Sequence, residues 1–384
     1  AESERKENDM KKDRTFNAWL ANFRKTKLER YDDAFLDSFL LDINVLPHVL
    51  DKDQNQSEVT SSVADYTNRL CSEDRFLKGK SSRVKWSKVL DQIEDAYGVP
   101  ATVLLALWGI ETSYGSVRGD IPTLSALATL AFDGRRQKFF EQELCAAIEI
   151  LHNLRNPAQV LIGSWAGAMG HTQFMPSTYL KYAIDFDGKG WADIWSDSPI
   201  DALASAASYL SSHGWSQSLP WGRVVTLPHD FDFALTAPKI VKPVSEFLQM
   251  GLGGLPCELE VLGSIFLPMG ASGPAFWISD NFSVLKQYNK SVSYALSIGL
   301  LSDGFKTGAL CHLNWPSNTK ALSRSDMKKL QSRLTYQGFD TQGCDGVFGP
   351  NTEIAIRGFQ SKNALVKDGY PSHHLLNLVC HKLT

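Results

Sequence analysis

The residue in this sequence that is best placed for acid–base chemistry is Glu111. Leu104, Leu107, Trp108 and Glu111 follow the i, i+3, i+4, i+7 spacing that puts side chains on one face of a helix. A carboxyl group on an apolar face loses hydration, and near the end of a helix it meets the negative end of the helix dipole. Both effects favour the uncharged acid, the form that a general acid for a glycosidic oxygen requires. A structural glutamate paired with a buried arginine would show the same spacing, so Glu111 alone does not identify a reaction.

A second segment, residues 163–177, has the composition of a loop that recognises a polar ligand. Its glycines would let the backbone approach a ligand closely. Ser164 offers a hydroxyl group and Gln173 a planar amide, and such groups recognise sugar hydroxyl and acetamido groups. The alternative is a glycine-rich packing loop without a ligand. We expect His171 in this segment to be an incidental loop histidine rather than a catalytic base.

Most glycosidases use two carboxyl groups, but residues 163–177 contain none. Folding could bring in Asp120 or Asp133, although both have the local sequence of ordinary loop acids. One acid is sufficient if an acetamido group of the substrate stabilises the cationic centre of the transition state. The sequence therefore favours a single carboxyl group and leaves a second one open.

Residues 185–193 resemble the start of an EF-hand calcium loop. Asp185 and Asp187 stand at positions 1 and 3, and Gly190 stands at position 6, where the loop turns sharply. Position 5 is Lys189, although an oxygen ligand is expected there. A cation at this position repels Ca²⁺ or occupies its place.

The loop also lacks the last ligand of an EF-hand. No glutamate stands at position 12, so Asp197 or Asp201 would have to substitute for it. If calcium binds, we expect Asp185, Asp187 and Asp201 to hold it. The alternative is a turn whose aspartates are satisfied by local hydrogen bonds.

The elements that must position these residues are mostly helices. Apolar residues recur at helical spacing over much of the first 212 residues. Pro100 and Gly115 delimit the helix that carries Glu111. The predicted helices cover residues 16–23, 34–41, 63–77, 84–97, 101–111, 124–132, 137–154 and 202–212.

The composition changes near Trp221. Residues 221–285 are rich in proline and glycine and contain short β-prone runs such as 223–227, which predicts a small β-containing subdomain. Residues 289–301 return to helical spacing. The sequence therefore predicts a mainly α (α+β) protein.

Length and charge limit the domain organisation and the function classes. A chain of 384 residues is long enough for two or three domains. Residues 1–13 are charged and lack an apolar period, so we expect a flexible N-terminus that is disordered or loosely helical, and residues 313–319 have the composition of a linker. A net charge of -3 does not favour nucleic acid or an anionic membrane as a partner. No apolar run reaches the ~18 residues of a transmembrane helix, so we expect no transmembrane segment.

The six cysteines contain no CxxC pair, which argues against zinc and thioredoxin chemistry. In an exported protein they would permit up to three disulfides, and we favour Cys344–Cys380 because both residues lie near the C-terminus. Buried free thiols are the alternative, above all for Cys71 and Cys145. Ala1 in place of methionine fits an exported chain after removal of its signal peptide, or a trimmed one.

Several long motifs, in the right order, resemble those of the membrane-bound lytic transglycosylase B family. The motifs occupy residues 97–100, 108–115, 167–176, 201–210 and 288–295. The resemblance covers about residues 15–312. It implies a catalytic domain over residues 14–312 with a lysozyme-like helical core and a β-containing insertion at about 221–285.

The resemblance also implies a reaction. Glu111 would be the single acid/base that protonates the β-1,4 glycosidic oxygen between N-acetylmuramic acid and N-acetylglucosamine of peptidoglycan. As a carboxylate it would then deprotonate the muramoyl C6 hydroxyl, which attacks C1 and leaves a 1,6-anhydromuramoyl end without consuming water. The positions that match the family's substrate groove are Ser164, Gln173, Tyr209, Tyr288, Asn289 and Tyr294. No cofactor would be required, although some relatives bind calcium at the loop of residues 185–193, and the location would be the periplasm, in a soluble protein or one trimmed from a lipoprotein.

The last residues, 320–384, resemble the three-helix peptidoglycan-binding domain. Leu330, Leu334, Ile356 and Phe359 fit core spacing in this module. The module would raise the effective concentration of the enzyme at the wall. A purely structural cap is the alternative.

The sequence is also compatible with two other functions. A lysozyme-type hydrolase would use the same glutamate with water and would leave reducing muramoyl ends. A non-catalytic wall-binding protein would leave the wall intact. The product ends, and the effect of Glu111→Gln, distinguish the three.

Overall fold

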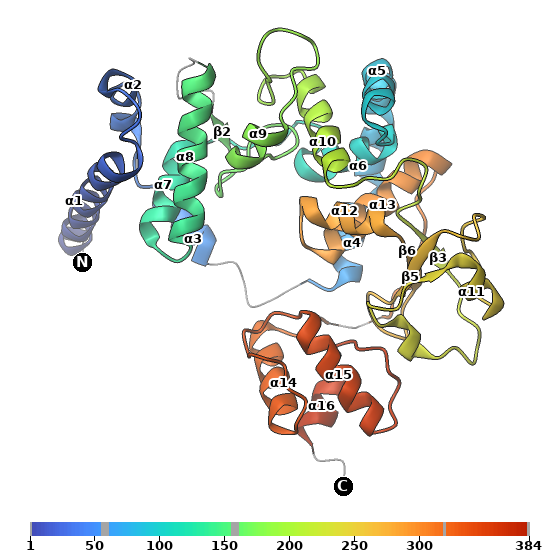
Figure 1. Ribbon diagram of the computed structural model, residues 1–384. Helices are drawn as coiled ribbons and strands as arrows, with labels where there is room; N and C mark the ends of the chain where they lie inside the picture. Colours follow the sequence, from blue (N-terminus) through green and yellow to red (C-terminus); the bar gives the residue numbers. More distant parts are fainter. Residues whose placement is uncertain (1, 55–60, 155–160, 318–319, 382–384) are drawn as a thin grey trace. The chain divides into compact units, whose positions relative to one another are not determined.

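Helices dominate the computed structural model, which describes residues 2–54, 61–154, 161–317 and 320–381 (Figure 1). The α-helices of the described residues are α1 (Glu2–Lys27), α2 (Asp33–Asp37), α3 (Pro47–Gln54), α4 (Val63–Leu70), α5 (Glu73–Tyr97), α6 (Ala101–Thr112), α7 (Thr123–Asp133), α8 (Gln137–Leu154), α9 (Pro176–Tyr182), α10 (Ile200–Ser212), α11 (Val244–Gln249), α12 (Asp280–Tyr288), α13 (Val292–Thr307), α14 (Arg324–Tyr336), α15 (Pro350–Lys362) and α16 (His373–Cys380). The strands are β1 (Ile121–Pro122), β2 (Ile162–Gly163), β3 (Gly222–Val225), β4 (Lys242–Pro243), β5 (Leu262–Phe266) and β6 (Ala275–Ile278). Short 3₁₀ helices occupy η1 (Leu40–Asp42) and η3 (Phe233–Thr236).

The described residues fall into two compact units. Unit 1 draws on residues 1–56, 81–97 and 107–209, and unit 2 draws on 57–80, 98–106 and 210–384. Helices α5, α6 and α10 therefore have residues in both units. Within the described parts of the chain, no single helix is both long and apolar enough to cross a membrane, and only α5 with α6, as a bent pair, meets that test of length and composition.

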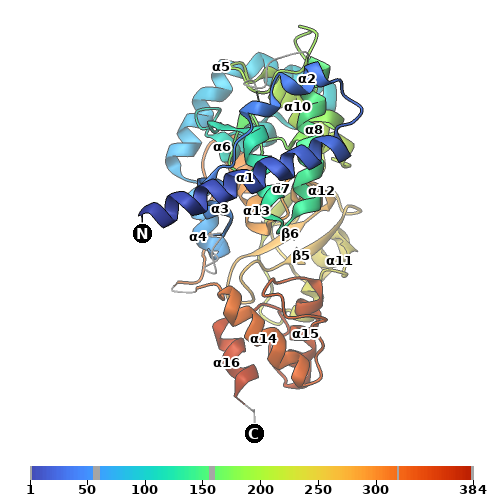
Figure 2. The ribbon, with the colours of Figure 1, turned by 90° about the vertical axis from the view of Figure 1, so that its left-hand side faces the viewer.

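Helix α1 begins earlier than the sequence predicted. We expected a flexible N-terminus over residues 1–13 that is disordered or loosely helical, and residues 2–13 form the first turns of α1, as in the helical alternative. Acidic and basic residues four positions apart support such an exposed helix. The packed part begins at Phe16, which is buried and meets the ring of Phe132 edge-on at 5.4 Å. Figure 2 shows α1 crossing in front of α7, with which it is in contact.

The core of unit 1 is built on α7 and α8, which pack against each other along the pair. Almost all of α7 is buried, and the hydroxyl groups of Ser125 and Thr129 have hydrogen-bond partners. Ser125 Oγ accepts the backbone N–H of Asn44 at 3.1 Å, and Thr129 Oγ1 accepts that of Leu46 at 3.0 Å. These bonds attach the chain before α3 to the buried helix.

Unit 2 contains a small antiparallel sheet with the strand order β3-β6-β5-β4. Ile265 of β5 pairs with Trp277 of β6, and both are buried. They pack with Val244 and Phe247 of α11 in one hydrophobic cluster. All four strands of this sheet lie within residues 221–285, where the sequence predicted a small β-containing subdomain.

Two predicted helices have different boundaries in the structure. Residues 63–77 form α4 and the start of α5, because Ser72 Oγ accepts the N–H of Arg75 at 3.1 Å and starts a new helix. Residues 289–301 do not begin a helix at 289, because Ser291 caps α13 by accepting the N–H of Tyr294 at 3.2 Å. Local capping decides both boundaries.

Helices α14, α15 and α16 form a three-helix module with its own hydrophobic core. The predicted core residues are buried at 0–3% exposure: Leu330, Leu334, Ile356 and Phe359. Part of the linker predicted over residues 313–319, residues 318–319, lies outside the described residues.

The module contacts the β-containing part of unit 2. The Arg357 guanidinium donates hydrogen bonds to the carbonyl oxygen of Phe233 at 3.4 Å and to Thr236 Oγ1 at 3.1 Å. Asp368 Oδ2 accepts the N–H of Ala271 at 2.9 Å. These hydrogen bonds connect the three-helix module to the β-containing part.

All six cysteines are free thiols, so the expected Cys344–Cys380 disulfide is not formed. Cys380 packs against the core of the three-helix module, whereas Cys344 is exposed on the loop before α15. Cys71 and Cys145 are half-buried, as the alternative reading expected, and burial raises the pKa of the Cys71 thiol to about 12.

Candidate active site

Glu111 lies in the last turn of α6 and is half-buried. The sequence predicted one apolar face for this helix, but the residues from Ala101 to Trp108 are buried on all sides. Helix α6 is therefore a central core helix, and Glu111 is its only charged residue. The fold presents a single carboxyl group at the C-terminal end of a buried helix.

The turn after α6 has an unusual backbone. Ser113, Tyr114 and Gly115 all have positive φ angles, of 48°, 60° and 83°. Left-handed backbone is unfavourable for the first two residues, and such strain persists only where surrounding contacts impose it. Gly115 N donates to Thr112 Oγ1 at 3.0 Å, and a Cβ atom at Gly115 would lie 2.3 Å from Nδ1 of His171. This turn fixes where the helix of Glu111 ends.

His171 is the main contact between α6 and the glycine-rich loop. The Trp108 indole Nε1 donates to His171 Nδ1 at 3.2 Å, and His171 Nε2 lies 2.6 Å from the carbonyl oxygen of Ser196. These partners assign the proton to Nε2 and leave the ring neutral. Burial, with the nearby Arg118 guanidinium, lowers the pKa of His171. The histidine has a structural role, so the expectation that it is not the base agrees with its contacts.

The backbone of the loop is also tied to α6. Thr112 Oγ1 donates to the carbonyl oxygen of His171 at 2.7 Å. A Cβ atom at Gly163 would lie 2.0 Å from the carbonyl oxygen of Ala168. We expected the glycines of this loop to make room for a ligand, but at Gly163 the space is filled by the loop itself.

The two polar candidates of the loop lie at its turns. Ser164 is half-buried, and its N–H donates to the carbonyl oxygen of Ala168 at 2.8 Å. Gln173 has a φ of 55°, and its amide Nε2 donates to the carbonyl oxygens of Gly170 at 2.9 Å and Arg118 at 3.3 Å. The amide nitrogen is therefore held by the protein, and the amide Oε1 is the atom with which Gln173 can accept a bond from a ligand.

Tyr209 of α10 joins the loop through aromatic contacts. Its ring lies 6.2 Å from that of Phe174 and 5.1 Å from that of Tyr182. Burial raises the pKa of its hydroxyl, and Tyr182 adds to the effect. Glu111, Ser164, Gln173 and Tyr209 thus belong to unit 1 and are connected through the 163–177 loop.

The remaining substrate candidates belong to unit 2. The rings of Tyr288 and Tyr294 are stacked at 6.4 Å and 8°. Asn289 Oδ1 accepts the N–H of Ser291 at 3.1 Å, at the start of α13. Tyr294 is only 2% exposed, so most of its ring contacts protein.

The structure also shows a buried carboxyl group that the sequence reasoning missed. Glu143 of α8 is buried and accepts hydrogen bonds from Ser177 Oγ at 2.5 Å and from Ser177 N at 3.0 Å. These bonds cap the start of α9. Asp120 and Asp133, the candidates for a second carboxyl group, are exposed. Glu143 could have been found from the sequence, because it is an acidic residue on the face of α8 that carries the buried apolar residues.

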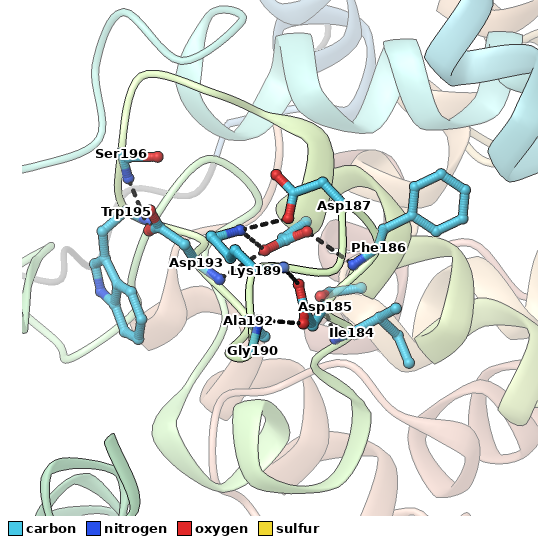
Figure 3. Close-up of polar contacts among 12 residues, drawn as sticks. Ile184, Asp185, Phe186, Asp187, Lys189, Gly190, Ala192, Asp193, Trp195 and Ser196 are labelled. Atoms are coloured by element: carbon cyan, nitrogen blue, oxygen red, sulfur yellow. Dashed lines mark hydrogen bonds and ion pairs between the residues drawn. The ribbon is translucent and has the colours of Figure 1, made fainter. Parts of the chain in front are cut away.

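The calcium-like loop is closed by its own lysine (Figure 3). The carboxylate oxygens of Asp185, Asp187 and Asp201 approach within 4.8 Å of one another. The Lys189 ammonium donates to Asp187 Oδ1 at 2.8 Å and also to Asp201 Oδ2. The expected ligands are therefore brought together, with a protein cation among them.

Similarity to known proteins identifies the family. Residues 15–303 match the family model described as Transglycosylase SLT domain. The chain belongs to this transglycosylase family. Residues 323–378 match the peptidoglycan binding domain family. Among curated proteins, membrane-bound lytic murein transglycosylase B of Escherichia coli (strain K12) is 30% identical over 285 residues, which are 70% of this chain and 76% of that protein.

Solved structures of transglycosylases have the same fold. SltB3 from Pseudomonas aeruginosa in complex with NAG-anhNAM-pentapeptide is 40% identical with a TM-score of 0.90, over 95% of this chain and 99% of that chain. The Escherichia coli lytic transglycosylase Slt35 in complex with calcium is 26% identical with a TM-score of 0.64, over 77% of this chain and 94% of that chain. The expected lysozyme-like helical core with a β-containing subdomain and a C-terminal peptidoglycan-binding module is therefore confirmed.

Proposed function

We propose that this transglycosylase cleaves the β-1,4 bond between N-acetylmuramic acid and N-acetylglucosamine in peptidoglycan and leaves a 1,6-anhydromuramoyl end. The observation that carries this assignment is the single half-buried carboxyl group of Glu111 at the end of α6, within the segment that matches the family. The similarity to SltB3, which was solved in complex with NAG-anhNAM-pentapeptide, supports the same product chemistry.

In this mechanism Glu111 acts twice. As an acid, it donates its proton to the glycosidic oxygen while the C1–O bond breaks. As a carboxylate, it takes the proton of the muramoyl C6 hydroxyl, whose oxygen forms the new bond to C1. The glutamate regains its proton and no water enters the balance. The acetamido group of the substrate stabilises the positive charge at C1, which makes a second protein carboxylate unnecessary.

The proposed substrate contacts use polar and aromatic side chains of both units. Gln173 Oε1 accepts hydrogen bonds from hydroxyl and acetamido N–H groups of the sugars, and the Ser164 hydroxyl donates or accepts. Tyr209, Tyr288 and Asn289 provide aromatic and amide contacts along the strand. Because Tyr294 is 2% exposed, it acts mainly by supporting the ring of Tyr288, with which it stacks.

The domain organisation and location complete this function. Residues 14–312 carry the reaction, residues 313–319 connect, and residues 320–384 bind peptidoglycan and raise the effective concentration of the enzyme at the wall. The reaction needs no cofactor, and calcium is not part of it. The protein acts in the periplasm, where its substrate lies.

Mass spectrometry of muropeptides released from purified sacculi tests this function. The expected products carry anhydromuramoyl ends, and Glu111→Gln releases none while still binding sacculi. Reducing muramoyl ends would instead indicate a lysozyme-type hydrolase. Equal digestion by the Glu111→Gln variant would refute Glu111 as the catalytic acid, and the absence of digestion by the unmodified enzyme would favour a non-catalytic wall-binding protein.

A further inference from the structure

Lys189 occupies the centre of a loop that has the sequence pattern of a calcium loop. It stands at position 5, between acids at positions 1 and 3 and a glycine at position 6. Its ammonium donates hydrogen bonds to Asp187 Oδ1 and Asp201 Oδ2 and lies 5.9 Å from the centroid of the Trp191 ring. Asp201 comes from α10, so this one cation joins the loop to a core helix.

The carboxylate oxygens around Lys189 are already used within the protein. Both oxygens of Asp185 accept backbone N–H groups, from Lys189 at 3.1 Å and from Gly190 at 2.8 Å. Asp201 Oδ1 accepts the N–H of Phe186 at 2.9 Å, and its Oδ2 accepts the N–H of Asp193 at 2.8 Å in addition to the ammonium. These bonds organise the loop without an ion.

Calcium does not fit this arrangement. A bound Ca²⁺ requires six to eight oxygen ligands at about 2.3–2.6 Å. Here the residue at the fifth position brings a positive charge that lies among those ligands, and the backbone takes both oxygens of Asp185. The residue that stands where an oxygen ligand is expected therefore carries a positive charge of its own.

Lys189 does not simply form an exposed ion pair at the surface. The side chain of Asp201 is 0% exposed, whereas exposed ion pairs contribute little to stability. A buried carboxylate without a compensating cation is strongly unfavourable. The positive charge of Lys189 is therefore needed in the folded state in the same way that the charge of an ion would be.

We propose that the Lys189 ammonium permanently replaces calcium in this loop, so that the loop is held closed in a metal-independent way. The contacts continue from Asp201 to the N–H of Asp193, whose Oδ1 accepts the N–H of Ser196 at 3.1 Å. Ser196 in turn accepts a hydrogen bond from His171, which contacts the helix of Glu111. Lys189 thus stabilises the segment of unit 1 that contacts the end of the catalytic helix.

The first experiment uses the unmodified full-length protein. Thermal unfolding is followed in EDTA and in millimolar CaCl₂, and Tb³⁺ is titrated as a calcium probe whose luminescence the neighbouring indoles of Trp191 and Trp195 sensitise. We expect the same Tm in both buffers and no saturable Tb³⁺ signal. A Tm that rises with Ca²⁺, together with a saturable Tb³⁺ signal that Asp187→Asn abolishes, would overturn the replacement of calcium by Lys189.

The second experiment removes the ammonium. Lys189→Asn places a neutral oxygen ligand at position 5, and in EDTA we expect its Tm to fall by roughly 5–10 °C because the buried Asp201 loses its partner. Ca²⁺ is expected to restore most of this loss and Tb³⁺ to bind. Lys189→Met, which keeps the apolar stem, separates the loss of the charge from the loss of packing and should show the same fall in EDTA.

Lys181→Asn is the matched control, since Lys181 is an exposed lysine of α9 in the same unit. It should leave the Tm unchanged and bind no Tb³⁺. If neither Lys189 variant lowers the Tm in EDTA, the ammonium does not hold the loop. If the Lys189 variants do not fold, the calcium and Tb³⁺ titrations of the unmodified protein still decide the question. None of these readouts uses the glycosidic reaction, so their outcome is independent of the proposed function.

Discussion

The indole Nε1 of Trp108 donates a 3.2 Å hydrogen bond to Nδ1 of His171, two residues that lie 63 positions apart in the chain. Both side chains are 2% exposed. The bond joins the helix that carries Glu111 to the loop that carries Ser164 and Gln173. The position of Glu111 relative to these two polar candidates therefore depends on a buried pair of side chains.

Trp108→Phe tests this pair. The phenyl ring keeps most of the apolar contact but leaves His171 Nδ1 without a donor, so we expect a loss of about 1–3 kcal/mol in the free energy of unfolding. Turnover of sacculi should fall more than binding of sacculi. Denaturant unfolding and muropeptide release measure the two effects, and Trp86→Phe, at a half-buried residue of α5, is the control. Unchanged stability in Trp108→Phe would argue against the bond.

The stability of the protein should depend on His171 in mild acid. Burial lowers the pKa of this histidine below its usual 6.5, so the unfolded chain binds a proton at a higher pH than the folded chain. Its contribution is therefore complete above about pH 6.5 and is lost as the pH falls below that value. His171→Gln should flatten this slope in denaturant unfolding measured between pH 5 and 7. A slope that is unchanged in the variant would contradict the neutral ring.

Asp303 should make the stability of the protein depend on pH in the opposite direction. Its carboxylate accepts the Trp221 indole N–H at 3.2 Å, and burial raises its pKa to about 6. The folded protein therefore holds a proton that the unfolded chain releases near pH 4, and stability falls as the pH rises from about 4 to about 6. Relative to the unmodified protein, Asp303→Asn should gain on the order of 3 kcal/mol across this range. Parallel pH profiles of the two proteins would rule out a raised pKa.

Thiol labelling checks the state of the cysteines. The exposed Cys257, Cys311 and Cys344 should react with iodoacetamide at pH 8 in the native protein. Cys71 should stay unlabelled until the protein unfolds, because burial raises its pKa to about 12 and its Sγ donates to the carbonyl oxygen of Ser297. Peptide mass spectrometry reads out each site. Protection of Cys344 that is lost only on reduction would indicate a disulfide after all.

Arg357→Ala should loosen the contact between the three-helix module and the β-containing part of unit 2. The guanidinium donates to Phe233 and Thr236, and its side chain is only 15% exposed. We expect faster hydrogen exchange in residues 233–237 and a loss of about 1–3 kcal/mol in the free energy of unfolding. Arg357→Lys should not restore protection, since an ammonium cannot reach two acceptors in the geometry of the planar guanidinium.

The sequence by itself determined the features that depend on neighbouring residues. The spacing between Pro100 and Gly115 placed Glu111 at the end of a helix, and the periodicity of Leu330, Leu334, Ile356 and Phe359 gave the core of the C-terminal module. These patterns involve residues that are close in the sequence, so they predict local structure without knowledge of the tertiary fold. The change in composition at residue 221 likewise marked the β-containing part.

Only the tertiary structure decided what contacts between distant segments produce. It showed that His171 is a neutral structural residue, that the space at Gly163 belongs to the loop itself, and that α6 is buried on all sides. It also placed the Lys189 ammonium between acids of the loop and of α10. The sequence alone left open whether this lysine repels Ca²⁺ or occupies its place. Each of these depends on distances between side chains from different elements, which the order of residues along the chain does not contain.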